Sequence, residues 1–259
     1  MVKVNSQGKD FIKFLGTAGA RFVMIEQLRA SGGIWISYQG TNILVDPGPG
    51  SIVRCATSTP KLNPAELDCI ILTHKHLDHA NDINVMIEAM TGGGFKKRGV
   101  VFCPQDAISE DSIILRYVRN FPEKFEILKP KMRYKEGRFL FETSMQHLHA
   151  AITYGLKFKL GKTRFALLTD TRYFKELEDF YKVDILIISV VFLEPRPGID
   201  HLCLADAEKI IKAVKPKKAI LTHFGMSMLK ASPPLLAKKL SEKTGIRVEA
   251  AYDGMVVSL

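Results

Sequence analysis

His74-Lys75-His76-Leu77-Asp78-His79 places four metal-ligand side chains within six consecutive positions of this chain. The stretch follows the apolar run Cys69–Leu72 and Thr73, a pattern that predicts a buried strand opening into a loop. Ordinary composition would produce His-x-His-x-Asp-His in a chain of this length with odds on the order of 10⁻⁴. One short loop is not expected to direct all four groups at a single tetrahedral centre. The motif therefore predicts two metal ions.

The second of these ions would find further ligands after two later strand-like runs. Asp78 and His79 lie one turn beyond the first two histidines and suit a neighbouring ion. Asp170 follows the run 165–169, and its two carboxylate oxygens suit a bridge between two ions. His223 follows the run 219–222 and would complete the second site.

The first site would be formed by His74 and His76, which can converge on one ion from a turn after a strand. His149 can complete it. Strand alternation, however, places His147 and His149 on the same face, so periodicity alone does not separate these two histidines.

Composition favours an ordinary globular protein with an anionic partner. The chain has 259 residues, of which 46% are hydrophobic and 25% charged, enough apolar material for a large core. The net charge of +10 favours phosphate esters or nucleic acid as partners, with a merely solvated basic surface as the alternative. Four widely spaced cysteines, without a Cys-x-x-Cys pair, predict reduced and buried thiols.

The location expected of this chain is the cytoplasm. Residues 1–10 lack the apolar core of a signal peptide. The longest apolar stretch, 183–193, is too short to span a bilayer and predicts a buried strand instead.

Hydrophobic periodicity outlines the remaining elements. The predicted strands are 11–15, 33–38, 41–46, 69–72, 100–102, 139–149, 153–160, 164–169, 185–188 and 218–221. The predicted helices are 63–67, 83–90, 113–118, 173–180, 204–214 and 233–243. Gln39-Gly40 predicts a hairpin turn, as does Asp253-Gly254 between the runs 247–252 and 255–257. Strands come early and alternate with helices later, which predicts an α/β fold with sheets inside and helices outside.

These motifs resemble those of the metallo-β-lactamase superfamily of metal-dependent hydrolases. With their flanking strands, the matching pieces span residues 11–254. The resemblance implies a four-layer αβ/βα sandwich of the metallo-β-lactamase type, with residues 1–259 as a single domain. The matching pieces are Phe14–Gly19, Asp46–Gly48, Thr73–His79, His149, Thr169–Thr171 and Leu221–Phe224.

Two features are most similar to the phosphodiesterase branch, which includes ribonuclease Z and the cyclic phosphodiesterase of phosphonate breakdown. One is the glycine-rich opening Leu15–Gly19. The other is the segment from His201 to His223, where these enzymes place an extra histidine that binds no metal. The resemblance implies that His201 donates a proton to the leaving oxygen or contacts the phosphate.

The resemblance also assigns roles that the residues leave open. Family spacing from His149 to Gly155 favours His149 over His147 as the metal ligand. Asp46 is expected to support the ligand loop by hydrogen bonding, and Asp78 is counted as a catalytic residue as well as a ligand.

One departure narrows the expected substrate. Ribonuclease Z usually carries a long tRNA-gripping arm between the third histidine and the bridging aspartate. Here His149 and Asp170 are 21 positions apart, so no arm fits. The departure favours the cyclic phosphodiesterase-like arrangement over tRNA processing.

The function expected from the sequence is a binuclear phosphodiesterase that acts on a small cyclic phosphodiester or an RNA end through a metal-bridging hydroxide. Two alternatives stay open: hydrolysis of a carboxylic ester, thioester or lactone on the same site, and a non-catalytic nucleic-acid-binding protein. Nitrogen and carboxylate ligands suit zinc first, with manganese or iron as alternatives. The expected partner is a small anionic substrate, with RNA and a second copy of the chain (a homodimer) as further candidates, and no membrane.

Overall fold

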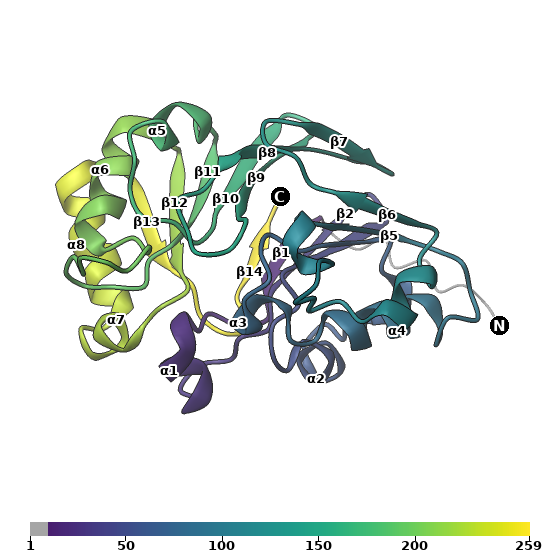
Figure 1. Cartoon of the computed structure of the whole chain (residues 1–259). Coiled ribbons are helices and arrows are strands. Elements are labelled where there is room, and N and C mark those ends of the chain that lie inside the picture. Colours follow the sequence, from purple (N-terminus) through teal and green to yellow (C-terminus); the bar gives the residue numbers. More distant parts are fainter. Residues whose placement is uncertain (1–9) are drawn as a thin grey trace.

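The computed structural model describes residues 10–259, which form two packed seven-stranded sheets with helices on their outer faces (Figure 1). The N-terminal residues that argued against a signal peptide lie almost wholly outside this described part. None of the helices within it is long and apolar enough to cross a membrane.

The first sheet combines antiparallel and parallel pairing. Its first four strands in spatial order pair antiparallel, and the pairs from β3 to β6 are parallel. Gln39 and Gly40, with φ of 47° and 80°, form the predicted hairpin turn between β2 and β3. The spatial order is β14(Val256–Ser258), β1(Phe11–Phe14), β2(Ile34–Tyr38), β3(Thr41–Val45), β4(Cys69–Ile71), β5(Val100–Cys103) and β6(Lys124–Ile127).

The second sheet is built the same way from the later part of the chain. Its strands from β10 to β13 pair in parallel, and those from β7 to β10 pair antiparallel. The spatial order is β13(Arg247–Ala250), β12(Lys218–Thr222), β11(Ile185–Ser189), β10(Thr163–Leu168), β9(Tyr154–Leu160), β8(Phe139–Gln146) and β7(Arg133–Glu136).

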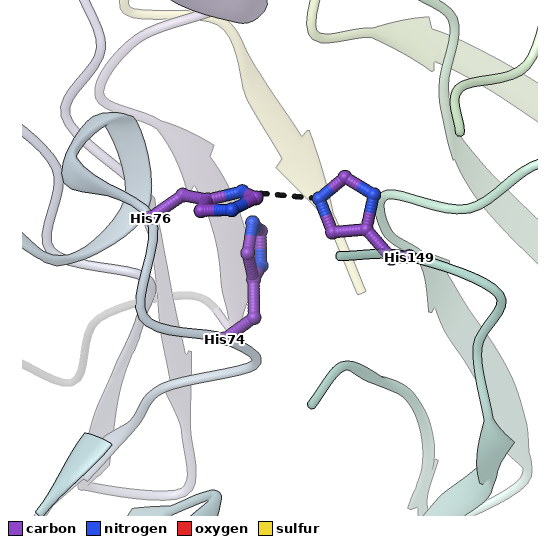
Figure 2. Close-up of side chains that lie close together, drawn as sticks. All are labelled: His74, His76 and His149. Atoms are coloured by element: carbon purple, nitrogen blue, oxygen red, sulfur yellow. Dashed lines mark hydrogen bonds between the residues drawn. The ribbon is translucent and has the colours of Figure 1, made fainter. Parts of the chain in front are cut away.

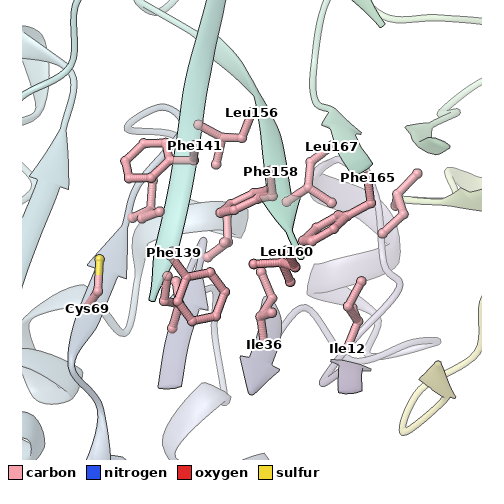
Figure 3. Close-up of a cluster of buried hydrophobic side chains, with 14 of the residues drawn as sticks. Ile12, Ile36, Cys69, Phe139, Phe141, Leu156, Phe158, Leu160, Phe165 and Leu167 are labelled. Atoms are coloured by element: carbon pink, nitrogen blue, oxygen red, sulfur yellow. The ribbon is translucent and has the colours of Figure 1, made fainter. Parts of the chain in front are cut away.

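Three apolar layers hold the sandwich together. The central one lies between the sheets, where Ile12 and Ile36 of the first sheet meet Phe139, Phe158 and Phe165 of the second (Figure 3). A second layer joins the outer face of the second sheet to helices α5(Leu177–Phe180), α6(Leu204–Val214), α7(Met226–Lys230) and α8(Pro233–Thr244). The third joins the first sheet to α2(Ser51–Thr57) and α4(Ile83–Thr91). The predicted four-layer αβ/βα class is confirmed.

Helix predictions succeeded where an amphipathic stripe was long. The predicted helix 204–214 is α6 residue for residue, and Asp206 caps it by accepting a hydrogen bond from the Cys203 backbone N–H at 3.0 Å. The predicted helix 233–243 is one residue short of α8. The four cysteines are free and buried, as predicted.

Three predicted helices were too long or of the wrong type. In place of 113–118, the chain forms a 3₁₀ turn η3(Arg116–Asn120), because the Arg119 guanidinium donates to the carbonyls of Ile108 and Ile114 and satisfies them without helical bonding. Of 173–180, only α5(Leu177–Phe180) is helical. The short helix predicted at 63–67 is the 3₁₀ turn η1(Pro64–Glu66), capped by the Asn63 side chain. A further 3₁₀ turn, η2(Gln105–Ala107), follows β5.

The predicted C-terminal hairpin around Asp253-Gly254 was wrong. Strand β13 pairs with β12 in the second sheet, whereas β14 pairs with β1 in the first. The segment between them crosses from sheet to sheet, and Asp253 fixes it by accepting hydrogen bonds from the Thr17 hydroxyl and the Ala30 N–H, both at 2.7 Å. Strand pairing across the sandwich thus overrode a local turn signal.

Candidate metal centre

Seven predicted ligands meet at one edge of the sandwich, where strands from both sheets end. The loop after β4 carries His74 and His76, and the short helix α3(Leu77–Ala80) that follows carries Asp78 and His79. The second sheet contributes residues that follow β8, β10 and β12, namely His149, Asp170 and His223. Sites at the carboxyl ends of parallel strands are common in α/β folds because loops from neighbouring strands converge there.

The glycine-rich opening after β1 packs closely against this edge. A Cβ atom on Gly19 would lie 2.0 Å from the His223 carbonyl oxygen, and one on Gly16 would lie 2.2 Å from the Ala30 carbonyl oxygen. A side chain on Gly19 would push the loop away from the strand end that carries His223, and one on Gly16 would push it away from the backbone of Ala30 and Gly32. The glycines therefore shape the centre without contacting a metal.

The first cluster consists of His74, His76 and His149, whose ring nitrogens all lie within 4.8 Å of one another. His76 comes from the first sheet and His149 from the second, and their imidazoles point toward each other with Nδ1 and Nε2 at 3.0 Å (Figure 2). Three imidazole nitrogens directed at one point make a tris-histidine cluster, a common form of zinc site.

The second cluster consists of Asp78, His79, Asp170 and His223, again within 4.8 Å. The Nε2 atoms of His79 and His223 lie 3.4 Å apart, and Asp170 Oδ2 lies 3.5 Å from the former and 3.3 Å from the latter. Asp78 Oδ2 is 3.5 Å from His223 Nε2. Two imidazoles and two carboxylates offer a complete shell for a second divalent ion.

Asp170 is the carboxylate that adjoins both clusters. Its Oδ2 lies 3.8 Å from His74 Nε2, in the first cluster, as well as close to the two imidazoles of the second. The residue is 2% exposed. A buried carboxylate between two groups of imidazoles has the position of a bridging ligand.

The unpaired buried atoms of the centre fit two cations. His74 Nε2, Asp170 Oδ1 and His201 Nδ1 are buried without any hydrogen-bond partner among the described residues. Buried polar atoms are nearly always paired because leaving one unpaired costs about 1–3 kcal/mol. In two places imidazole nitrogens also face each other directly. Divalent cations would satisfy the His74 and Asp170 atoms and the facing imidazole nitrogens, so the residues present fit a two-ion site.

Hydrogen bonds behind the ligands fix their orientation. Asp46 accepts from both the backbone N–H and the hydroxyl of Thr73, each at 2.7 Å, and pairs with His79 Nδ1 at 2.9 Å. His149 Nδ1 lies 3.0 Å from the Asp200 carbonyl oxygen. Such contacts turn the opposite ring nitrogen toward the metal. The predicted supporting role of Asp46 agrees with this geometry, whereas Thr73 and Asp200 had not been assigned one.

The charge states of His74 and Asp170 are those that metal ligands need, whereas that of His79 is not. Burial alone would lower the pKa of His79, but Asp78, Asp170 and Asp46 hold it well above its ordinary value, so metal binding there would displace a proton. Burial lowers the pKa of His74 well below its ordinary value, and the nearby His79 adds to the effect. Burial alone would raise the pKa of Asp170, but His223, His201 and His79 together hold it well below its usual range. A neutral imidazole and an ionised carboxylate are the forms that bind metal.

His147 is held away from the cluster. Its Nδ1 lies 3.1 Å from the Asp170 carbonyl oxygen and its Nε2 lies 2.8 Å from the Tyr181 hydroxyl, so both ring nitrogens already have partners. Burial lowers its pKa to about 4. His149, not His147, is directed at His74 and His76, in agreement with the predicted choice between the two.

We expect His149→Ala to weaken metal binding by more than roughly 100-fold, and His147→Ala by no more than about 10–100-fold, the usual contribution of a residue that supports a ligand. Metal titration of the two variants would measure the difference. Thermal unfolding without metal provides the control: the His147 variant should be the less stable, because it removes a buried hydrogen-bond partner of the Tyr181 hydroxyl. A reversed order of metal affinities would make His147 the ligand.

His201 lies beside the two clusters. Its Nδ1 is 3.6 Å from Asp170 Oδ2, and its ring lies 5.1 Å from that of His149. These three residues also form a group whose ligand atoms lie within 4.8 Å, so the geometry permits metal ligation as well as contact with a substrate. The other seven residues form two groups of candidate ligands that are complete without His201.

Two packed seven-stranded sheets with histidines and carboxylates clustered at their edge define the class, a metal-dependent hydrolase. The chain belongs to the beta-lactamase superfamily, because the model of the beta-lactamase superfamily domain matches residues 41–224. That range includes all seven predicted ligands.

Relatives by sequence agree with this assignment. The uncharacterized protein MJ1374 of Methanocaldococcus jannaschii is 31% identical over 96% of this chain and 94% of its own length. The ribonuclease Z of Thermococcus sibiricus is 26% identical over 81% of this chain and 72% of its own length. The resemblance to the branch that contains ribonuclease Z is therefore confirmed, as distant homology.

Solved structures confirm the fold. The metallo-beta-lactamase fold protein YhfI from Bacillus subtilis superposes with a TM-score of 0.81 at 20% identity, covering 97% of this chain and 100% of the other. A diphosphatase of the PhnP family superposes with a TM-score of 0.71 at 18% identity, covering 97% and 98%.

Proposed function

We propose that this protein hydrolyses phosphodiesters, with a small cyclic phosphodiester as the preferred substrate and an RNA end as the second. The observation that carries the proposal is the position of His201, a histidine next to the bridging aspartate that neither cluster requires. A phosphodiester has a poor leaving oxygen that needs a proton, and an imidazolium beside the scissile bond can donate one.

The residues divide the work as follows. His74, His76 and His149 would hold one divalent ion, and His79, Asp78 and His223 the other, with Asp170 shared. When bound, two such ions activate water and stabilise the attacking and leaving oxygens. Burial lowers the pKa of His201, although Asp170 opposes this, so its imidazolium form gives up a proton more readily than free imidazolium but is less populated at neutral pH. Asp46 and Asp200 orient the ligands.

The chain and its relatives support phosphate chemistry. A net charge of +10 attracts an anionic substrate. The relatives include a protein named ribonuclease Z and a structure named as a diphosphatase. Between His149 and Asp170 the chain is occupied by strands β9 and β10, which leaves no room there for a tRNA-gripping arm and favours a small substrate. We assign zinc to the site first, then manganese or iron.

A second candidate is hydrolysis of a carboxylic ester, thioester or lactone at the same centre, because the two clusters would activate water for any of these. We expect the zinc- or manganese-loaded protein to turn over bis(p-nitrophenyl) phosphate at least roughly tenfold faster than lactones and thioesters at equal concentration, because a chain of net charge +10 favours an anionic phosphate over a neutral ester. Parallel kinetic assays would measure this ratio. Faster lactone or thioester turnover would favour the second candidate. Salt-dependent RNA binding without any turnover would instead indicate a non-catalytic protein.

A further inference from the structure

A cavity of about 470 Å³ opens beside the metal centre. One wall belongs to the centre itself, and the other belongs to α1(Ala20–Ile25), the short helix between β1 and β2 (Figure 1). The volume is within the range of small-molecule sites. The lining residues are Arg21, Met24 and Ile25 from α1 together with His76, Leu77, Asp78, Asp170 and His201.

Helix α1 exposes more apolar surface than its attachment to the fold requires. Val23 is fully buried and anchors the helix, whereas Ile25 is 65% exposed. Leu77 lies across the cavity in α3 and is 56% exposed. Exposed apolar side chains that gather on one surface, rather than being scattered, mark a binding site. These two and Met24 surround the entrance to the centre.

Arg21 adds a free positive charge to the same wall. It is exposed and, apart from the histidines of the centre, is the only basic residue in the described part of the chain that lines the cavity. It forms no ion pair among residues 10–259, so its guanidinium is available to an anion. Arginines that do form such pairs in this range are Arg98, Arg133, Arg164, Arg172 and Arg247.

We propose that α1 selects the substrate, which is an organic phosphate ester with an apolar, ring-sized group. The phosphate lies against the metal centre and Arg21, and the apolar group packs against Met24, Ile25 and Leu77. This assignment rests on the proposed function, because it names the substrate class of that same site. The continuity of the cavity with Asp170 and His201 places the apolar wall within reach of an ester bound at the centre.

Binding of two simple anions tests the apolar wall without any need for turnover. Calorimetric titration of the metal-loaded protein should give an affinity about tenfold higher for phenyl phosphate than for inorganic phosphate, since burying a ring against apolar side chains contributes about one decade or more. Ile25→Ser should reduce this preference to about twofold and leave the affinity for inorganic phosphate unchanged. Leu28→Ser is the matched control, because Leu28 is 49% exposed but does not line the cavity.

The charge is tested separately. Arg21→Ala should lower the affinity for both anions by about tenfold, the contribution of a charge-assisted hydrogen bond, and leave the preference for phenyl phosphate unchanged. Arg116→Ala, at an exposed arginine outside the cavity, should change neither affinity.

The proposal is overturned if Ile25→Ser and Leu28→Ser both keep the native preference for phenyl phosphate. It is also overturned if Ile25→Ser lowers the affinity for both anions by the same factor. Its failure is distinct from failure of the proposed function. Suppose that bis(p-nitrophenyl) phosphate is not hydrolysed but phenyl phosphate still binds more tightly than inorganic phosphate, and Ile25→Ser removes the difference. This result would reject phosphodiester hydrolysis and keep α1 as the element that selects the substrate. If turnover is normal and Ile25→Ser does not change the preference for phenyl phosphate, only the role of α1 is rejected.

Discussion

Asp170→Ala should lower turnover by at least roughly 10³-fold and leave the chain unable to hold two metal ions. Asp170 is the carboxylate whose Oδ2 adjoins His74 in one cluster and His79 and His223 in the other. Its loss removes a ligand from both ions at once. Metal ions stabilise a hydrolytic transition state by several kcal/mol, and each 1.4 kcal/mol or so is a factor of about ten in rate.

Elemental analysis after metal reconstitution checks the structural half of this prediction. The native chain should reach a plateau at two ions, and the Asp170 variant should stay below two. Asp200→Ala is the matched control, because Asp200 supports His149 through its backbone carbonyl, which alanine keeps, while its side chain pairs with Arg172 at 3.7 Å. A native plateau at one ion would reject the binuclear assignment, and full activity of the Asp170 variant would reject its bridging role.

The grouping of the candidate ligands could be predicted from the sequence because metal chemistry restricts such ligands to few residue types. The chain has seven histidines, and a dense motif such as 74–79 has no structural explanation in an apolar core, where such groups are rarely buried unpaired. Each remaining candidate directly follows or lies close after a strand-like run. Because strands of both sheets end at the same edge, residues that directly follow these strands lie close together in space.

The choice between His147 and His149 could not be made from periodicity. The alternation argument assumed that the strand continued to His149, but β8 ends at Gln146 and its pairing with β9 is already irregular between Thr143 and Gln146. Both histidines therefore lie in a loop, where a period of two has no meaning. The two histidines differ because the hydroxyl of Tyr181, which is distant in sequence, hydrogen-bonds to His147 Nε2.

Elements stabilised by distant contacts were also invisible in the sequence. Helix α1 has six residues, of which Val23 is fully buried, and six residues are too few to show an amphipathic stripe. The cavity wall that it forms was accordingly missed. Likewise, the turn signal Asp253-Gly254 was real, but β14 gains its partner from β1 at the other end of the chain. Local patterns predict elements, and partners distant in sequence decide which strands pair.

His201 is the residue whose role depends most on how it is placed relative to the ions. It follows the loop 195–200, which contains two prolines and a glycine, and precedes α6. Its ring lies against Phe192, with centroids 5.9 Å apart, and its Nδ1 faces Asp170. Its side chain keeps 15% of its surface exposed. The imidazole is thus held at the rim of the centre, where a substrate oxygen could reach it.

His201→Ala should keep both metals and lower turnover of an alkyl phosphodiester by roughly 10²–10⁴-fold, the usual contribution of a general acid. Bis(p-nitrophenyl) phosphate provides the internal control on the same variant: its leaving group departs without a proton, so most of the loss should disappear. The comparison separates proton donation from a positioning role, which would lower both rates together. If the variant instead loses a metal ion, His201 is a ligand grouped with His149 and Asp170, and the argument for phosphodiester hydrolysis loses the observation that carries it.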